Sequence, residues 1–401
     1  MRLHSGAPFW LISDGLEEMG SAEPPPGSCD VVVIGAGITG ALVADMLTRE
    51  GLSVVILDRR APACGSTAAS TSLLTYEIDV SLKDLAGMMG WDDAVRAYAL
   101  SVRAVGDLER IAASLNTPTG FRRTSSVCLA ARRSHSRRLE AEAALRAREG
   151  IDAAYWSAKR VQQTYGFHSH GALYTDCTGV LDPVRFTRAL LTRAMRGGAV
   201  LRERTAALNL ETRGTGVRVS TERGKVEARW AVYAMGYEIP ASLRRGIVAL
   251  HTTYALVTEP VADLGPWGGD CIVWETGRPY FYMRATDDHR VMIGGADTPF
   301  KSDALRDQLM PGRTRKLEHR MATWLPAIET ETAFVWAGTF GETEDGLPYI
   351  GPAPGCPQIL YALGYGANGI TFGAIAARIL ADLCLGRGNE DTRLFRLDRK
   401  H

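Results

Sequence analysis

Three spaced glycines and one acid mark residues 30–58 as a segment that can hold phosphate groups. Gly35, Gly37 and Gly40 form a G-x-G-x-x-G pattern after the apolar run 30–34, and a helical apolar run follows. These glycines permit a tight turn, close approach of a pyrophosphate and close helix–strand packing, while the helix N-terminus presents free N–H groups. Asp58 ends the next apolar run, where a carboxylate can accept ribose hydroxyls. The spacing predicts a dinucleotide site without distinguishing FAD from NAD.

Two further segments have the composition of loops that contact a dinucleotide. Residues 65–70, Gly-Ser-Thr-Ala-Ala-Ser, are small or carry hydroxyls, and we expect a loop that leads into a helix. The apolar run that begins at 226 ends in Ala-Met-Gly-Tyr at 234–237. A turn of small residues like this one lets the end of a strand pack against a bound dinucleotide.

A segment in the C-terminal third favours FAD. Apolar residues 359–363 precede the glycine-rich run 364–369, and a helical apolar run continues to Leu385. The first N–H groups of such a helix stabilise negative charge. A reduced flavin carries an anion over N1 and C2=O that this helix start can stabilise. An NAD-dependent enzyme has no need of such an element at this place in the chain.

Composition and charge exclude several classes of partner. The 401 residues, 46% hydrophobic and 23% charged, are enough for two globular domains. The net charge of +1 gives no electrostatic reason to bind nucleic acid or an anionic membrane. No apolar run reaches the roughly 18 residues that a membrane span needs. The seven cysteines lack metal-ligand or C-x-x-C spacing, which indicates reduced thiols, a cytoplasmic location and no metal site.

Residues 1–28 precede the first predicted strand. Their apolar run 7–12 is too short for a signal peptide, and acidic residues follow where a cleavage site should be. We expect an arm laid over the folded body and anchored by Phe9 and Trp10. A disordered arm is the alternative.

The remaining patterns predict an alternation of helices and strands. The Arg/Glu/Ala-rich segment 132–148 is expected to be a helix whose charges form a solvated face. Further helices are expected at 84–115 and from Asp182-Pro183 to Arg196, and strands at 126–130, 199–210, 217–221 and 225–235.

Together these motifs resemble those of the FAD-dependent D-amino acid oxidase superfamily, in the branch that contains glycine oxidase and monomeric sarcosine oxidase. The resemblance covers nearly the whole chain after residue 28 and includes Leu181-Asp182-Pro183 and the W-x-G…D-G-x-P-x-I-G motif at 336–351. It implies an α/β fold, with a Rossmann-type FAD-binding domain and an α+β substrate domain containing a large antiparallel sheet. It also implies hydride transfer from a C–N bond of an amine or amino acid to N5 of a non-covalently bound FAD.

The resemblance also implies a division of the chain into domains. After the arm 1–28, the FAD-binding domain would consist of three stretches, 29–85, 151–245 and 335–401. The substrate domain would consist of 86–150 and 246–334.

Carried over position by position, the resemblance predicts contacts with FAD at the nucleotide end, along the loop after Asp58 and at the start of the last long helix. The expected cofactor-binding residues are Gly35, Ala36, Gly37, Ile38, Thr39, Gly40, Asp58, Arg59, Arg60, Gly65, Ser66, Thr67, Ala69, Ser70, Thr205, Ala206, Ala234, Gly236, Tyr237, Gly346, Gly366, Ala367, Asn368, Gly369, Ile370 and Thr371.

Two positions depart from the family pattern in ways that affect function. Relatives that oxidise amino acids have an arginine that holds the substrate carboxylate where this chain has Phe340, which cannot form that clamp. Sarcosine oxidase-like relatives have a lysine that assists O₂ reduction where this chain has Met292. Because Met292 lacks the charge of that lysine, the sequence leaves open whether the electron acceptor is O₂ or another molecule. A dehydrogenase, or a flavin-binding subunit without its own substrate, is the alternative to an oxidase.

The segment 278–285 offers replacement groups for the substrate. Tyr280, Tyr282 and Arg284 share one face of an expected strand, so Arg284 is expected to contact substrate or flavin; a surface or salt-bridged arginine is the alternative. Aromatic residues can form a cage that holds an amine. The candidate catalytic residues are Arg284, Tyr282, Tyr254, Trp336 and Phe340.

Overall fold

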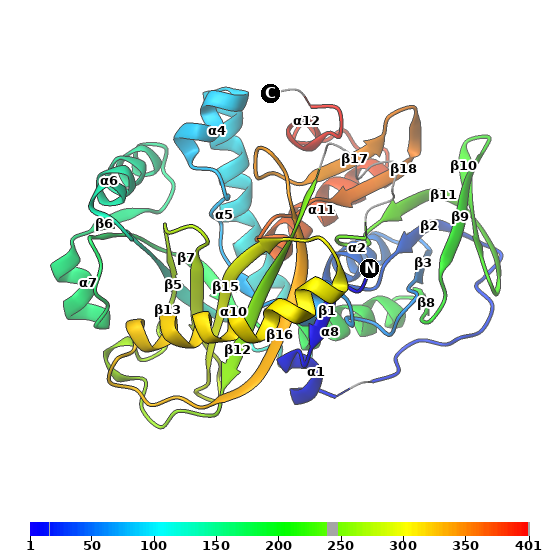
Figure 1. Ribbon diagram of the computed structural model, residues 1–401. Coiled ribbons are helices and arrows are strands. Elements are labelled where there is room, and N and C mark those ends of the chain that lie inside the picture. Colours follow the sequence, from blue (N-terminus) through cyan, green and yellow to red (C-terminus); the bar gives the residue numbers. More distant parts are fainter. Residues whose placement is uncertain (16, 239–247, 400–401) are drawn as a thin grey trace.

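The computed structural model of the chain describes residues 1–15, 17–238 and 248–399. Within these residues the strands form one sheet of eight strands and one of ten, and helices pack around both (Figure 1). The expected α/β fold, with a Rossmann-type part and a second large sheet, is confirmed.

The eight-stranded sheet has a parallel centre. Strand β2 pairs in parallel with β11 and β3, and β8 and β18 extend the parallel set on either side. Val31, Val32 and Val33 of β2 are fully buried, as expected for a central parallel strand covered on both faces. The strands are β2 (Ser28–Ile34), β3 (Val54–Leu57), β8 (Val200–Arg202), β9 (Ala207–Arg213), β10 (Gly216–Thr221), β11 (Gly224–Tyr233), β17 (Tyr349–Ala353) and β18 (Cys356–Leu363).

Three helices pack together over one face of this sheet. Helix α2 lies between α8 and α11, and their apolar residues join one core with Val31 and Val33. Val32 on the opposite face packs under the β9–β10 hairpin, against Val217 and Val219. The helices are α2 (Ile38–Arg49), α8 (Pro183–Arg196) and α11 (Gly369–Cys384).

The ten-stranded sheet is antiparallel except where β5 and β13 pair in parallel. Its order is β1-β16-β12-β15-β14-β13-β5-β7-β4, with β6 paired to β7. The strands are β1 (His4–Gly6), β4 (Leu73–Leu74), β5 (Arg122–Leu129), β6 (Ala154–Trp156), β7 (Ala172–Val180), β12 (Ala249–Thr258), β13 (Cys271–Glu275), β14 (Phe281–Ala285), β15 (Val291–Pro299) and β16 (Thr332–Glu342).

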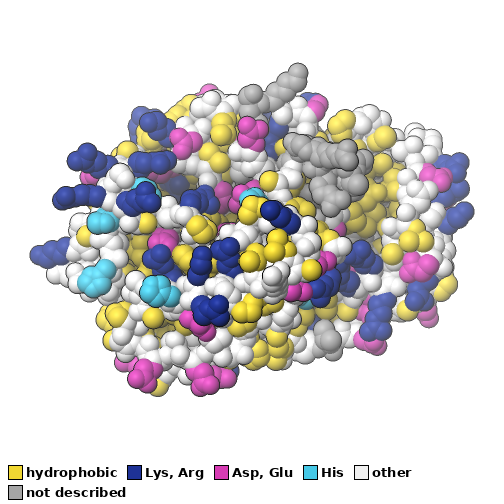
Figure 2. Space-filling model, viewed as in Figure 1, with side chains coloured by type: hydrophobic (Ala, Val, Ile, Leu, Met, Phe, Trp, Pro, Cys, Tyr) yellow, Lys and Arg dark blue, Asp and Glu magenta, His cyan; other side chains and the backbone are white. Residues whose placement is uncertain are grey.

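Helix α10 packs across β12, β15 and β16. Helix α6 carries many of the basic side chains that gather on the left of Figure 2, as expected for a solvated helix face. The remaining helices are α1 (Phe9–Ser13), α3 (Ser66–Ala69), α4 (Leu82–Met89), α5 (Trp91–Ala113), α6 (Arg133–Arg148), α7 (Ala158–Tyr165), η1 (Gly265–Trp267), α10 (Asp303–Trp324) and α12 (Thr392–Phe395).

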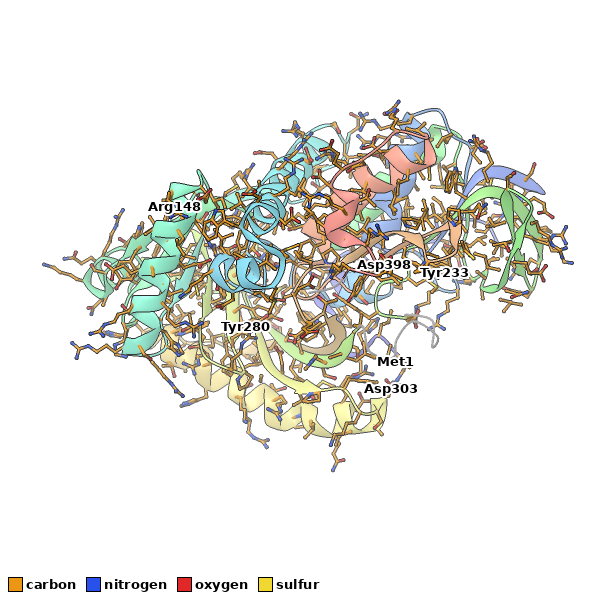
Figure 3. All side chains as sticks on the ribbon, turned by 90° about the horizontal axis from the view of Figure 1, so that it is seen from above. Met1, Arg148, Tyr233, Tyr280, Asp303 and Asp398 are labelled. Carbon is orange, nitrogen blue, oxygen red and sulfur yellow. The ribbon has the colours of Figure 1, made fainter. Side chains whose placement is uncertain are left out.

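The N-terminal arm is packed on the body of the protein. Strand β1 pairs with β16, and Phe9 and Trp10 of α1 are buried in an apolar cluster with Trp336. In Figure 3 Met1 lies beside Asp303, whose carboxylate accepts the backbone N–H of Arg2 at 3.1 Å. The anchoring expected of Phe9 and Trp10 therefore matches the structure, and the disordered alternative does not.

The structure differs from the sequence-based predictions at the strand expected at 199–210 and at the domain boundaries. The strand expected at 199–210 breaks into β8 and β9, because Arg204 has a φ of 50° and the Thr205 N–H donates to the Asp58 carbonyl at 2.7 Å. Strands β4, β6, β7 and most of β16 join the ten-stranded sheet, although the predicted boundaries assign them to the FAD-binding domain. The domain boundaries stay a prediction, and the one at 245/246 lies outside the described residues.

Candidate active site

A cavity of about 1370 Å³ is lined by residues from both sheets. One end lies at the carboxyl ends of β2 and β3, and the other is lined by Tyr282 of β14 and Phe340 of β16. The topology thus brings a nucleotide-type loop and a face of the antiparallel sheet into one space.

The glycine turn has the shape of a phosphate cradle. Gly35 has a φ of 114° and its N–H donates to the Leu57 carbonyl at 2.8 Å, so the chain turns sharply at the end of β2. A Cβ on Gly40 would collide with the carbonyl oxygen of Gly35, which explains why the helix packs so closely there. Gly37 is the N-cap of α2 and lines the cavity, where the helix N-terminus favours an anion.

Asp58 lines the cavity beside this turn. Its carboxylate accepts the N–H groups of Ala36 and Arg60, both at 2.7 Å, and burial raises the pKa of Asp58. Arg59 and Arg60 both pair with Glu238, with 2.7 Å for Arg60. The backbone N–H bonds hold the carboxylate in place at the position where ribose hydroxyls are expected.

The loop after Asp58 closes the cradle. The Thr67 hydroxyl accepts the Ile38 N–H at 3.0 Å and so ties α3 to the start of α2. Ser66 lines the cavity, and its hydroxyl is buried without a hydrogen-bond partner among the described residues. A buried hydroxyl without a partner is unusual in a native protein, and a ligand oxygen at this place would satisfy it.

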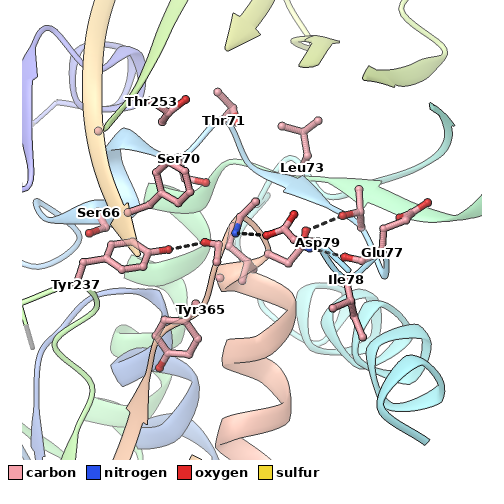
Figure 4. Close-up of a pocket in the computed structure, with 18 of the residues that line it drawn as sticks. Ser66, Ser70, Thr71, Leu73, Glu77, Ile78, Asp79, Tyr237, Thr253 and Tyr365 are labelled. Atoms are coloured by element: carbon pink, nitrogen blue, oxygen red, sulfur yellow. Dashed lines mark hydrogen bonds between the residues drawn. The ribbon is translucent and has the colours of Figure 1, made fainter. Parts of the chain in front are cut away.

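The start of α11 lines the same cavity (Figure 4). The Asn368 side-chain oxygen accepts the Thr75 hydroxyl at 2.7 Å, and the Tyr237 hydroxyl donates to the Gly366 carbonyl at 2.9 Å. In the described part of the chain, nothing accepts the N–H groups of Gly369 and Ile370. These free amides fit the anionic edge of a reduced flavin.

The other end of the cavity is aromatic and acidic. The rings of Tyr280 and Tyr282 lie 6.0 Å apart, and the Tyr282 hydroxyl is 3.1 Å from that of Thr253. Asp297 lines this end, with one carboxylate oxygen buried and without a partner among the described residues. Burial raises the pKa of Asp297 to about 7. Asp79 lines the cavity too, accepts the Ala367 N–H at 3.3 Å, and has its pKa raised by burial.

A third part of the cavity extends toward α4 and α6. Its exposed lining residues include Lys83, Arg132 and Arg138. Deeper in, Arg146 is buried and donates to Glu142 and to the hydroxyls of Tyr76 and Tyr98. Arg146 therefore has its hydrogen bonds filled by protein groups and is not poised for a substrate.

Most residues expected at the cofactor line this cavity. They are Gly35, Gly37, Ile38, Thr39, Asp58, Arg59, Arg60, Gly65, Ser66, Thr67, Ala69, Ser70, Ala206, Ala234, Gly236, Tyr237, Gly366, Ala367, Asn368, Gly369 and Ile370. Five others are not among the residues that line it: Ala36, Gly40, Thr205, Gly346 and Thr371. Thr371, for example, turns its hydroxyl to the Thr75 carbonyl at 2.9 Å.

Of the candidate catalytic residues, Tyr282 and Phe340 line the cavity, and three do not. Arg284 is 3% exposed and donates to the carbonyls of Ser72 at 3.0 Å and Leu181 at 3.2 Å, so it holds a loop and does not face a substrate. Tyr254 is buried in the sheet core. The Trp336 indole N–H donates to the Ala69 carbonyl at 2.9 Å, behind the cofactor loop. The expected role of these three residues at the substrate is therefore corrected.

Sequence reasoning missed several lining residues. Asp297 lies near the end of β15, and none of the sequence patterns described above includes it. Asp79 and Glu77 lie in a segment without a pattern of its own, and they reach the cavity because 75–79 packs on the start of α11. Of the described cysteines, Cys128 alone lines the cavity.

The family follows from a comparison of the whole chain. The family model "DAO: FAD dependent oxidoreductase" matches residues 30–383, which include the phosphate cradle, Asp58 and the start of α11. The chain belongs to the DAO family of FAD-dependent oxidoreductases. FAD is its cofactor, and the cradle, the free hydroxyl of Ser66 and the free amides of α11 fit that group. As an enzyme of this family it acts on a C–N bond of an amine or amino acid.

Similar proteins of known activity cover nearly the same length. Glycine oxidase of Bacillus licheniformis is 26% identical over 387 residues, which are 92% of this chain and 97% of that protein. The crystal structure of glycine oxidase from Geobacillus kaustophilus has a TM-score of 0.78 at 22% identity, and the match covers 94% of this chain and 100% of that one. L-proline dehydrogenase from P. horikoshii has a TM-score of 0.77 at 16% identity, covering 93% and 98%. The two structures show the fold.

No described helix is long and apolar enough to cross a membrane. Within the same residues, no group of three or more His, Cys, Asp or Glu side chains is arranged to hold a metal ion.

Proposed function

We propose that this chain oxidises a small amine or amino acid by hydride transfer from the carbon next to nitrogen to N5 of FAD. The observation that carries the proposal is the continuous cavity, which joins the cradle at Gly37 to the end lined by Tyr280, Tyr282 and Phe340. FAD, when bound, supplies the hydride acceptor. A molecule at the aromatic end would therefore share one space with the cofactor.

The chain's own residues supply position and environment. Tyr280, Tyr282 and Phe340 form walls that exclude water and limit how a small amine can lie, which is the contribution that hydride transfer requires of a protein. The loop 70–72 is held by Arg284 and the start of α11 by Tyr237, so both sides of the cofactor site are fixed.

One observation favours a dehydrogenase over an oxidase as the second candidate. Met292 lies in an apolar cluster with Ala69 and Trp336, where the oxidase-like relatives described above have a lysine. A methionine brings no positive charge to O₂. Glycine oxidase and L-proline dehydrogenase are both among the similar proteins, so either acceptor suits this fold.

Anaerobic titration of the FAD-loaded protein tests the proposal. Primary amines, N-methylated amines and amino acids are added in turn, and at least one is expected to bleach the visible flavin absorbance and yield an aldehyde or keto acid. Fast recovery of colour on admission of air would identify an oxidase, and slow recovery with rapid dye reduction a dehydrogenase. Failure of every compound, while dithionite still bleaches the flavin, would favour a flavin-binding subunit.

We also propose a reducing compartment, such as the cytoplasm, as the place of work. All seven cysteines are unpaired in the structure, and Cys128, Cys271 and Cys384 are buried. Free thiols of this kind persist where disulfides are kept reduced. A thiol titration of the denatured protein from cells is expected to count seven.

A further inference from the structure

A β-bulge aims Asp297 into the cavity. Strand β15 pairs with β12 at Thr298 and again at Gly295, so Ala296 and Asp297 together stand opposite the single residue Thr253. Ala296 has a φ of 56°, a conformation that costs energy for a residue with a side chain. Bulges of this kind re-aim side chains beside active sites. The backbone is thus arranged to present one carboxylate to the space between the sheets.

The carboxylate of Asp297 is only partly satisfied by hydrogen bonds. One of its oxygens is buried without a hydrogen bond among the described residues. The pKa of Asp297 is raised to about 7, chiefly by burial. Glu342 and Asp79 also raise this pKa, whereas the Thr253 hydroxyl and Arg278 lower it. A buried carboxylate with an unbonded oxygen is costly, and a cation placed against it would remove that cost.

The surroundings of Asp297 suit a cation better than an anion. Tyr280 and Tyr282 line this end of the cavity with aromatic rings, and aromatic rings attract ammonium groups. Phe340 is apolar, and its ring centroid lies 5.7 Å from that of His251, with the rings tilted by 37°. Among described residues near this end, Arg278 supplies a positive charge, but it is exposed and lies 4.7 Å over the ring of Tyr280. A substrate carboxylate at this end of the cavity would lie near Asp297 and Asp79, whose negative charges repel it.

We propose that Asp297 binds the ammonium group of the substrate, and that the substrate is an amine with no carboxylate on the carbon that is oxidised. This inference rests on the proposed function and names its substrate class. Binding pairs the cation with the carboxylate. One N–H bond then breaks, its proton moves to the free oxygen of Asp297, and the nitrogen keeps the electron pair. The neutral amine can lose hydride from its carbon to the FAD that the family's chemistry supplies.

Two molecules of the same shape and opposite charge test the binding step. The tert-butylammonium ion has no hydrogen on the carbon next to nitrogen, so it cannot be oxidised, and pivalate replaces its ammonium with a carboxylate. Each is titrated into the FAD-loaded protein and followed by the flavin spectrum and by calorimetry. We expect tert-butylammonium to bind at least about tenfold more tightly than pivalate. Equal binding, or tighter binding of pivalate, would overturn the inference.

Asp297→Asn removes the charge and keeps the shape. The variant is expected to weaken tert-butylammonium binding about tenfold or more and to leave the FAD content unchanged. Asp263→Asn is the matched control, because Asp263 is exposed, lies outside the cavity and accepts only the Gly265 N–H at 2.8 Å. An effect of equal size in both variants, or in neither, would contradict the role of Asp297.

The pH dependence gives a second readout. The cation needs the ionised carboxylate, so its dissociation constant should fall as pH rises through about 7 and then level off. The dependence should vanish in Asp297→Asn. If it vanishes in Asp79→Asn instead, the assignment to Asp297 is wrong. The titratable or charged groups that face Asp297 are Asp79, Glu342, Arg278, Tyr280 and Tyr282.

Substrate preference separates this inference from the proposed function. If α-amino acids bleach the flavin and simple amines do not, the proposed function stands and the substrate class is wrong. In that case Arg278→Ala would raise KM for the amino acid, since Arg278 would hold its carboxylate. If no compound bleaches the flavin although tert-butylammonium binds through Asp297, the proposed function fails and the cation site remains.

Discussion

Two buried charged side chains near the cavity, Arg284 and Asp297, differ in how far their hydrogen bonds are satisfied. Arg284 is buried, burial lowers its pKa to about 10, and backbone carbonyls of three separate segments surround its guanidinium. Asp297 lines the cavity and has one buried carboxylate oxygen without a hydrogen bond among the described residues. A charge held by several backbone carbonyls, such as that of Arg284, stabilises the fold, whereas a carboxylate with one unbonded oxygen is suited to a ligand.

Replacing Arg284 should therefore affect the cofactor before the substrate. Arg284→Met keeps the length of the side chain but leaves the Ser72 and Leu181 carbonyls without their donor, a cost of about 2 kcal/mol. We expect FAD to bind roughly 30-fold more weakly, as measured by flavin fluorescence on titration. Arg133→Met, at an exposed position of α6, is the control. Unchanged FAD affinity together with a raised KM for the substrate would show that Arg284 acts on substrate binding and not on the cofactor loop.

Sequence patterns predict residues of local motifs better than residues whose position depends on pairing between distant strands. Gly37, Asp58 and Ser66 sit in local motifs whose geometry follows from neighbouring residues, and all three line the cavity. Asp297 depends on a bulge opposite Thr253, which requires a strand more than 40 residues earlier in the chain. Nothing in the local spacing of 291–297 reveals that bulge, so the acid could not be predicted by pattern alone.

At the scale of elements, the N-terminal arm supports the cofactor loop. Strand β1 extends the ten-stranded sheet, the His4 ring lies 3.1 Å from the Cys64 carbonyl, and the Trp10 indole N–H donates to the Ser70 carbonyl at 2.7 Å. Both carbonyls belong to the segment that closes the cradle. The arm was expected from its aromatic residues, but its contacts with the loop were not, because they join residues 60 positions apart.

Removing one hydrogen bond tests whether the arm supports the cofactor loop. Trp10→Phe keeps an aromatic ring in the cluster and removes the donor to Ser70, a loss of about 1 kcal/mol. The expected result is about fivefold weaker FAD binding and a lower Tm in the FAD-loaded protein. Ile12→Ala, whose side chain is 51% exposed, should change neither quantity. Equal behaviour of the two variants would show that the arm does not reach the cofactor site.

Across the whole molecule, function depends on where two sheets meet. The eight-stranded sheet supplies the cradle at Gly37, and the ten-stranded sheet supplies Tyr282, Asp297 and Phe340. The alternation of strands and helices allowed the fold class to be predicted, because each element has its own periodicity. That β4, β6, β7 and β16 belong to the ten-stranded sheet could not be predicted, because sheet membership depends on pairings between distant segments.

The central claim is that an amine in this cavity gives hydride to FAD. The direct measurement is anaerobic rapid mixing of the FAD-loaded protein with its best amine and with the same amine deuterated on the carbon next to nitrogen. The account predicts complete bleaching of the flavin in both cases, at a several-fold lower rate with deuterium because the C–H bond breaks in that step. Bleaching by dithionite but by no amine or amino acid would contradict it.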